Sequence, residues 1–169
     1  TQINCDFKIV VDDRPNQKPN AFQTQDSNGR PIIAFNIPLI LAARNEDELA
    51  FVMGHEAAHH ISGHLIRTMQ NARVGAVVMS GLAALGGASA DAVKTAGNLG
   101  AQVGARSYSK GFEIEADELG TVIGAKAGYN PLVGVKFFTQ IPDPGNKFLG
   151  THPPNAARVA AVKRVASGL

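Results

Sequence analysis

Two histidines and a glutamate stand together in the segment HEAAH, which covers positions 55–59. On a helix, residues four apart lie one above the other with Cβ atoms about 5–6 Å apart, so His55 and His59 can bind one ion. Glu56 is rotated about 100° from His55 by the helical pitch, so it can lie beside a metal without coordinating it. From that position Glu56 can act as a general base toward water. The segment therefore predicts zinc-dependent hydrolysis.

A third metal ligand must come from another segment, because a catalytic zinc ion takes three protein ligands and keeps one position open. The candidates are His152, Cys5 and an acidic residue in the cluster at 113–118. Glu113 and Asp117 share one helix face, so one carboxylate could bind the ion while the other orients a ligating histidine. Acidic residues at a helix start also complement the helix dipole. Spacing alone leaves this choice open.

His60 and His64 form a second pair of histidines with a spacing of four. This pair points about 100° away from the first one. It also lacks the adjacent base, because position 61 is isoleucine. We expect packing or surface roles for both, with His64 a candidate partner of a metal-binding side chain.

The HEAAH segment lies within the best-defined helix of the sequence. Asn45 has the character of an N-cap, Glu48 follows three residues later, and acidic residues fill the first turn. Apolar residues at helical spacing extend this helix from about Glu46 to His64 or beyond. Further helices are expected at 37–43, 113–127, 131–139 and 154–166, and strands at 6–11, 32–35 and near 21–24.

The composition predicts one globular domain over residues 1–169, because 44% of the residues are hydrophobic and 18% are charged. The predicted fold class is α+β, mainly α, with a small N-terminal β-sheet and an active-site helix. A formal net charge of +2 is too small to predict nucleic-acid binding. Cys5 is the only cysteine, so no intramolecular disulfide can form.

Residues 74–90 carry no charge. A transmembrane helix needs about twenty predominantly apolar residues, and glycines and serines dilute the hydrophobicity of this segment. We expect a small-residue helix packed closely inside the domain, and the alternative is a membrane-leaning or mobile flap.

Several motifs occur in a characteristic order. They are NAF at 20–22, NEDELAFVMGHEAAH at 45–59, EIEAD at 113–117, and THPP at 151–154 followed by Arg158. In these motifs the chain resembles metallopeptidase family 48, the group of CAAX prenyl proteases and HtpX-like proteases of membranes and the periplasm. Lys110, where the family frequently has arginine, departs from the family pattern, as does His60, where an aliphatic residue is usual.

The resemblance implies a gluzincin-type zinc peptidase domain with one Zn²⁺ ion, bound by His55, His59 and Glu113. It implies that Asp117 is the carboxylate behind a ligating histidine. It also places His152 and Arg158 near the metal, where they would assist catalysis. In some relatives the equivalent histidine instead caps the metal as a fourth ligand.

The implied activity is that of a zinc-dependent endopeptidase with Glu56 as general base, acting on proteins or peptides in quality control of the cell envelope. The alternative is a non-catalytic or latent zinc-stabilised binding module whose metal is capped by His152. The resemblance favours a bacterial periplasm or a membrane-associated envelope as the location, with membrane proximity supplied by a region missing from these residues. The oligomeric state and any removed signal or anchor are not predicted.

An extended substrate needs a strand with a free edge. The apolar run of Ile32, Ile33, Ala34 and Phe35 is the candidate, if it lies at the edge of the sheet above the cleft.

Overall fold

A computed structural model describes residues 3–107, 109–143, 145 and 152–169. A small N-terminal sheet is followed by a mainly helical part, as the fold class predicted. In chain order the elements are β1 (Lys8–Asp12), β2 (Ala21–Gln25), β3 (Pro31–Asn36), α1 (Ile37–Ala42), α2 (Glu46–Ile61), α3 (His64–Leu85), α4 (Ala90–Ser107), α5 (Ser109–Lys126), α6 (Pro131–Gly134), the 3₁₀ helix η1 (Val135–Thr139) and α7 (Asn155–Ala166).

The three strands form a sheet in the order β1-β3-β2. β1 runs parallel to β3 and β2 runs antiparallel to it, so that Ile33 pairs with Ile9 on one side and with Gln23 on the other. The continuous apolar run of β3 is typical of a strand buried on both faces. The expectation that residues 32–35 form an edge strand is therefore wrong, because both edges of their backbone are already paired.

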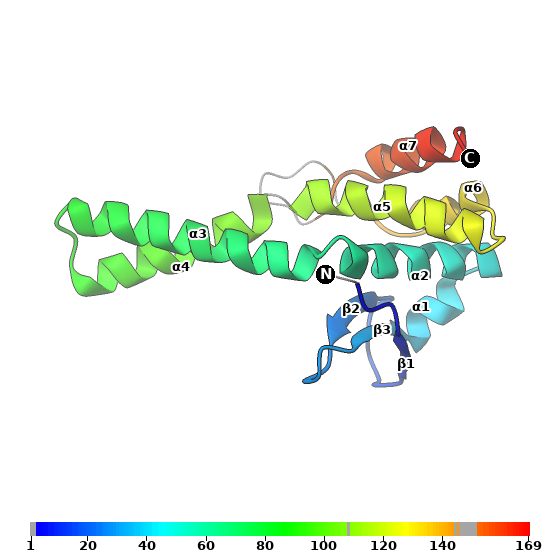
Figure 1. Cartoon of the computed structure of the whole chain (residues 1–169), viewed down its shortest axis with the longest axis horizontal. Coiled ribbons are helices and arrows are strands. Elements are labelled where there is room, and N and C mark those ends of the chain that lie inside the picture. Colours follow the sequence, from blue (N-terminus) through cyan, green and yellow to red (C-terminus); the bar gives the residue numbers. More distant parts are fainter. Residues whose placement is uncertain (1–2, 108, 144, 146–151) are drawn as a thin grey trace.

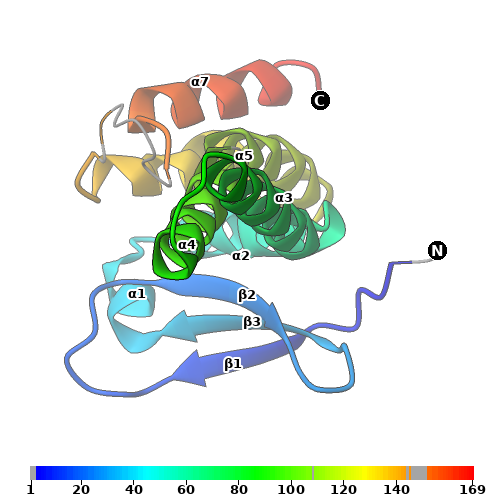
Figure 2. The ribbon, with the colours of Figure 1, turned by 90° about the vertical axis from the view of Figure 1, so that its left-hand side faces the viewer.

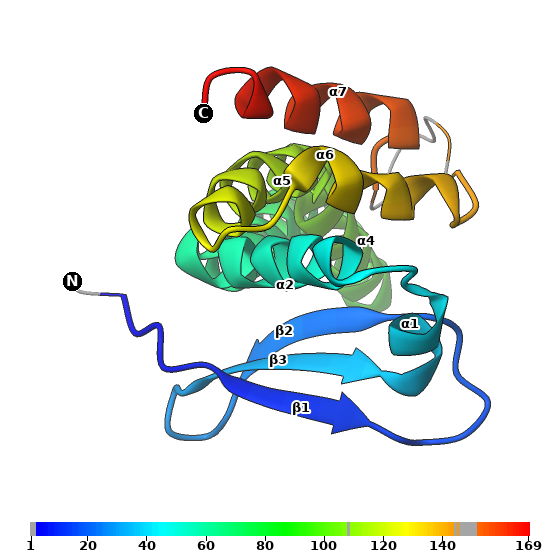
Figure 3. The same ribbon diagram turned by 90° about the vertical axis from the view of Figure 1, so that its right-hand side faces the viewer.

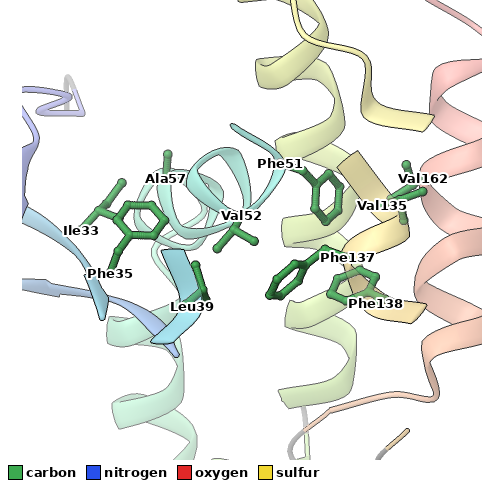
Figure 4. Close-up of a cluster of buried hydrophobic side chains, with 10 residues drawn as sticks. All are labelled: Ile33, Phe35, Leu39, Phe51, Val52, Ala57, Val135, Phe137, Phe138 and Val162. Atoms are coloured by element: carbon green, nitrogen blue, oxygen red, sulfur yellow. The ribbon is translucent and has the colours of Figure 1, made fainter. Parts of the chain in front are cut away.

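The elements stack in layers, and α2 is the middle layer (Figures 2 and 3). The sheet lies on one side of α2, whereas α5 and α7 lie on its other side. Apolar side chains from the sheet, from α2 and from the segment around η1 meet between these layers (Figure 4). The rings of Phe51 and Phe138 pack edge to face, with centroids 5.5 Å apart. The buried cluster comprises Ile33, Phe35, Leu39, Phe51, Val52, Ala57, Val135, Phe137, Phe138 and Val162.

Helix α2 begins as the sequence predicts. The side chain of Asn45 accepts a hydrogen bond from the backbone nitrogen of Glu48 at 3.0 Å. The helix ends at Ile61, however, and does not continue to His64. Gly63 takes a left-handed conformation with φ of 64°, and α3 starts at the next residue. Glycine adopts this conformation without steric cost, so the break is encoded locally.

Helices α3 and α4 pair as a hairpin that projects from the rest of the molecule (Figure 1). Their backbones approach closely at Gly75 and Gly100, where an added Cβ would lie 2.1 Å from a carbonyl oxygen of the opposite helix. The expected close packing of small residues is present, but it lies between these two helices and not inside the body of the domain, where it was expected. The outer surface of α3 is not covered, and Val77 and Leu85 are 71% and 89% exposed. Among the described residues, no helix is both long enough and apolar enough to cross a membrane.

The remaining helices largely match their expected ranges. α1 and α7 agree to within one residue at each end. α5 starts at Ser109, four residues before the expected start. The helical segment after Asn130 is α6 followed directly by η1. Much of the segment 141–150, which follows η1, lies outside the described residues.

Candidate metal centre

Three side chains from two helices converge at one point. Nε2 of His55 and Nε2 of His59, both on α2, lie 3.0 Å apart. Glu113 on α5 places Oε1 3.2 Å from Nε2 of His59 and Oε2 3.6 Å from Nε2 of His55. One ligand atom from each of the three residues lies within 4.8 Å of the other two. Two imidazoles and one carboxylate are a ligand set that catalytic zinc sites use, so these residues fit a metal ion.

The two helices can bring these groups together because they nearly touch at glycines. A Cβ atom on Gly54 would lie 2.8 Å from the carbonyl oxygen of Gly120, and one on Gly120 would lie 2.8 Å from the backbone nitrogen of His55. Glu113 lies two helical turns before Gly120 on α5. Small residues at this crossing therefore set the distance between the carboxylate and the histidines.

His55 is held from behind by a buried carboxylate. Its Nδ1 donates a hydrogen bond to Oδ1 of Asp117 at 2.9 Å. Arg158 from α7 donates two bonds of 2.7 Å to the same carboxylate, one to each oxygen. Burial and the charge of Arg158 would lower the pKa of His55, but the hydrogen bond to Asp117, together with the charges of Glu113 and Asp117, raises it. The hydrogen bond leaves Nε2 of His55 directed at the convergence point.

The pKa of Glu113 is lowered despite the burial of its carboxyl group. Burial alone would raise its pKa, but hydrogen bonds from His152 and His59, together with the charges of His55 and Arg158, lower it well below its usual range. Nδ1 of His152 donates to Oε2 of Glu113 at 3.0 Å. The lowered pKa favours the ionised form of Glu113, which is the form that can bind a cation.

Glu56 occupies a different kind of environment. It lies on the wall of a cavity of about 540 Å³ that also exposes His55 and His59. Burial raises the pKa of Glu56, and the neighbouring histidines oppose this shift only in part. A carboxylate with a raised pKa is a stronger base, which is the property that water activation requires.

One side of this cavity is formed by β2 and the residues that precede it. Pro19 to Gln23 line the cavity, whereas residues 32–35 do not. β2 is an edge strand, so its outer side is not paired within the sheet. The weak strand signal near 21–24 gave no hint that this strand would lie nearest to the centre.

Other sequence candidates lie apart from the convergence point. Cys5 is exposed and unpaired, and it does not line the cavity. His60 packs edge to face on Phe7 and its Nε2 lies 2.8 Å from the carbonyl oxygen of Asn4. This packing role is the one expected for His60. Thr151 of the THPP motif lies outside the described residues.

The structure places His64 against a candidate ligand, as expected for a partner of a metal-binding side chain, but sequence reasoning missed the groups that surround it. Nδ1 of His64 is 2.8 Å from Nδ1 of His59, and its Nε2 faces Glu115. Glu115 in turn accepts two hydrogen bonds from Arg67. The available signal was Gly63, a helix-breaking residue immediately before His64.

The family model described as Peptidase family M48 matches residues 3–166 of the chain. The chain belongs to this family. Its members are metal-dependent peptidases, and the His-His-Glu group could hold the metal that the family uses. Family membership confirms the resemblance that the sequence motifs indicated.

The peptidase chain is similar to longer proteins. A putative beta-barrel assembly-enhancing protease of Vibrio cholerae is 33% identical over 66% of the chain and 24% of that protein. The beta-barrel assembly-enhancing protease of Yersinia pestis is 29% identical over 90% of the chain and 33% of that protein. The mitochondrial metalloendopeptidase OMA1 of Saccharomyces cerevisiae is 27% identical over 90% of the chain and 45% of that protein. The chain thus spans less than half the length of each of these relatives.

Proposed function

We propose that this chain is a zinc-dependent endopeptidase, in which His55, His59 and Glu113 bind the ion and Glu56 is the general base. The observation that carries the proposal is the convergence of three ligand atoms within 4.8 Å beside a cavity that Glu56 also lines. A bound zinc ion would polarise the peptide carbonyl group and make a water molecule more acidic. The reaction adds the oxygen of water to the carbonyl carbon and breaks the C–N bond.

The protein groups carry the protons in this reaction. Glu56 takes a proton from the attacking water and passes it to the nitrogen of the leaving amine. His152 is half-exposed beside Glu113, so its ring can reach an oxyanion in the cavity. Arg158 is buried and engaged by Asp117, which supports a positioning role rather than contact with substrate.

Substrate would bind in an extended conformation along β2. The unpaired edge of this strand borders the cavity, and main-chain hydrogen bonds to it would hold a peptide with little sequence preference. Two relatives are named as beta-barrel assembly-enhancing proteases, which supports unfolded or misassembled proteins of a bacterial envelope as substrates.

The test is cleavage of casein by the zinc-loaded protein with Glu56→Gln as the variant. Loss of a general base should lower kcat by about 10²–10⁴-fold while the zinc content stays the same. Glu46→Gln, at an exposed position in the first turn of the same helix, is the matched control and should keep full activity. A Glu56→Gln protein that cleaves at the normal rate with zinc bound would refute the assignment.

A latent, metal-capped form is the second candidate, because His152 already contacts the Glu113 carboxylate. If His152 caps the ion, His152→Ala should raise activity. If His152 assists catalysis, the same variant should lower kcat. A chelator should abolish cleavage in either case.

A further inference from the structure

The imidazole of His59 is in contact with a second side chain on the side that faces away from the candidate metal position. Its Nε2 faces His55 and Glu113, at 3.0 Å and 3.2 Å. Its Nδ1 lies 2.8 Å from Nδ1 of His64. We infer that His64 and Glu115 are positioning residues that fix the ring of His59 as a metal ligand. The inference rests on the proposed function, since it assigns a role relative to that metal.

The order of protons along this chain of contacts follows from the chemistry of imidazole. A ring nitrogen that binds a cation carries no proton, so a ligating His59 must carry its proton on Nδ1. Nδ1 of His59 then donates to Nδ1 of His64, which must be the bare nitrogen of that ring. His64 consequently carries its proton on Nε2, and this nitrogen lies 3.3 Å from Oε2 of Glu115. This arrangement satisfies the contact between His59 and His64, and it leaves the Nε2 proton of His64 near the Glu115 carboxylate as a charge contact rather than a hydrogen bond.

His64 and Glu115 are themselves held in place by neighbouring side chains. Arg67 donates to both oxygens of Glu115, at 3.1 Å and 2.9 Å. The ring of His64 stacks on Phe112, with centroids 4.6 Å apart and an angle of 11° between the planes. The guanidinium group of Arg67 also lies over Phe112. His64 is buried, so its ring has little freedom to turn away from His59.

The contact between His59 and His64 depends on the break between α2 and α3. In an unbroken helix, residues five apart are separated by about 140° around the axis, and their side chains do not meet. The left-handed turn at Gly63 interrupts the helix, and His64 becomes the first residue of α3. The turn thus brings its ring back onto His59.

The two ligating histidines are therefore supported in parallel ways. His55 is oriented directly by Asp117, which Arg158 holds. His59 is oriented through His64 by Glu115, which Arg67 holds. Partners that orient metal-binding histidines typically change metal affinity by about 10–100-fold when they are removed.

The experiment measures the zinc affinity of the apo-protein by competition with a chromophoric chelator. His64→Ala should bind zinc about 10–100-fold more weakly than the wild type. His64→Asn should retain most of the affinity, because the amide oxygen can accept from Nδ1 of His59 where the imidazole nitrogen did. His60→Ala is the matched control, since His60 adjoins His59 but contacts Asn4 and Phe7, and its affinity should be unchanged.

Nitrogen NMR of the zinc-loaded protein detects the Nδ1 proton of His59, which a general loss of stability would not remove. The Nδ1 proton of His59 should be observed in the wild type and in His64→Asn, and it should exchange rapidly with water in His64→Ala. If His64→Ala does not fold, Glu115→Gln takes its place, because Glu115 is partly exposed, and its affinity should fall by about tenfold.

The outcomes separate this inference from the proposed function. Folded His64→Ala or Glu115→Gln proteins with wild-type affinity would overturn the positioning role and leave the metal site intact. Wild-type protein that binds no zinc, or binds it equally well after His59→Ala, would overturn both.

Discussion

Gly120 on α5 lies directly against the backbone of His55 on α2, so close that a Cβ atom on the glycine would lie 2.8 Å from the histidine nitrogen. This contact sets the separation of the two helices that carry the candidate ligands. Real Cβ atoms are not found so close to a backbone atom, and a side chain here must push the helices apart. The geometry of the centre therefore depends on a residue that takes no part in its chemistry.

We expect Gly120→Ala to weaken zinc binding by about tenfold or more, because it moves Glu113 away from the histidines. Overpacking should also lower the free energy of unfolding by about 1–3 kcal/mol. Gly124→Ala, one turn later on α5, is the matched control, since its Cβ would meet no atom within 4 Å. Calorimetric titration with zinc compares the two variants, and equal affinities would show that the crossing distance is unimportant.

Arg158→Met should destabilise the protein strongly. The guanidinium group pairs with Asp117 where both side chains are buried, and its removal leaves a buried carboxylate without its counter-ion. Such a change typically costs about 3–5 kcal/mol. Urea unfolding of the apo-protein measures the loss.

The control for Arg158→Met is Arg164→Met. Arg164 pairs with Glu118 between the same two helices, but both side chains of that pair are exposed. An exposed pair contributes about 0–1 kcal/mol, so little change is expected. Similar losses for the two variants would argue against a special role for the buried pair.

Gly100→Ala should loosen the hairpin of α3 and α4. Its Cβ would lie 2.1 Å from the carbonyl oxygen of Gly75, and backbone atoms cannot yield as a flexible side chain can. Hydrogen exchange across residues 64–107 should become faster. Gly81→Ala, also in the hairpin, meets nothing within 4 Å and should leave exchange unchanged or slower, because alanine favours the helix by about 1 kcal/mol.

Zinc should stabilise the folded protein through Glu113. A ligand that binds the native state alone adds about 2.7 kcal/mol to the free energy of unfolding at a concentration 100 times its Kd. Thermal unfolding with and without zinc should show this gain in the wild type and in Glu118→Gln, whose exposed side chain lies outside the centre. Glu113→Gln should lose most of it, and a full gain in that variant would exclude Glu113 as a ligand.

The sequence predicted well what is encoded within one helix. The spacing of His55 and His59 and the Asn45 cap are local features, and α2 forms where they place it. Position 113 could not be selected from spacing, because its approach to the histidines depends on packing at Gly120, which lies 65 residues beyond His55. The resemblance to the family motif indicated that Glu113 joins the two histidines, and the structure brings His55, His59 and Glu113 together.

The errors have physical causes of the same kind. The apolar run at 32–35 indicates a strand, but its pattern does not say which strands lie on either side of it, and β3 is central. The uncharged segment at 74–90 indicates close packing, and it does pack closely at Gly75, but its main partner is α4 rather than the body of the molecule. The topology of the fold decides which elements lie next to each other, and the spacing of apolar residues within one segment carries no information about that topology.

The most direct measurement is an anomalous-scattering map of zinc-loaded crystals, recorded at the zinc absorption edge. We expect one peak about 2.0–2.2 Å from Nε2 of His55, Nε2 of His59 and a carboxylate oxygen of Glu113. A peak bound by other residues, or no peak between α2 and α5, would contradict the proposed centre.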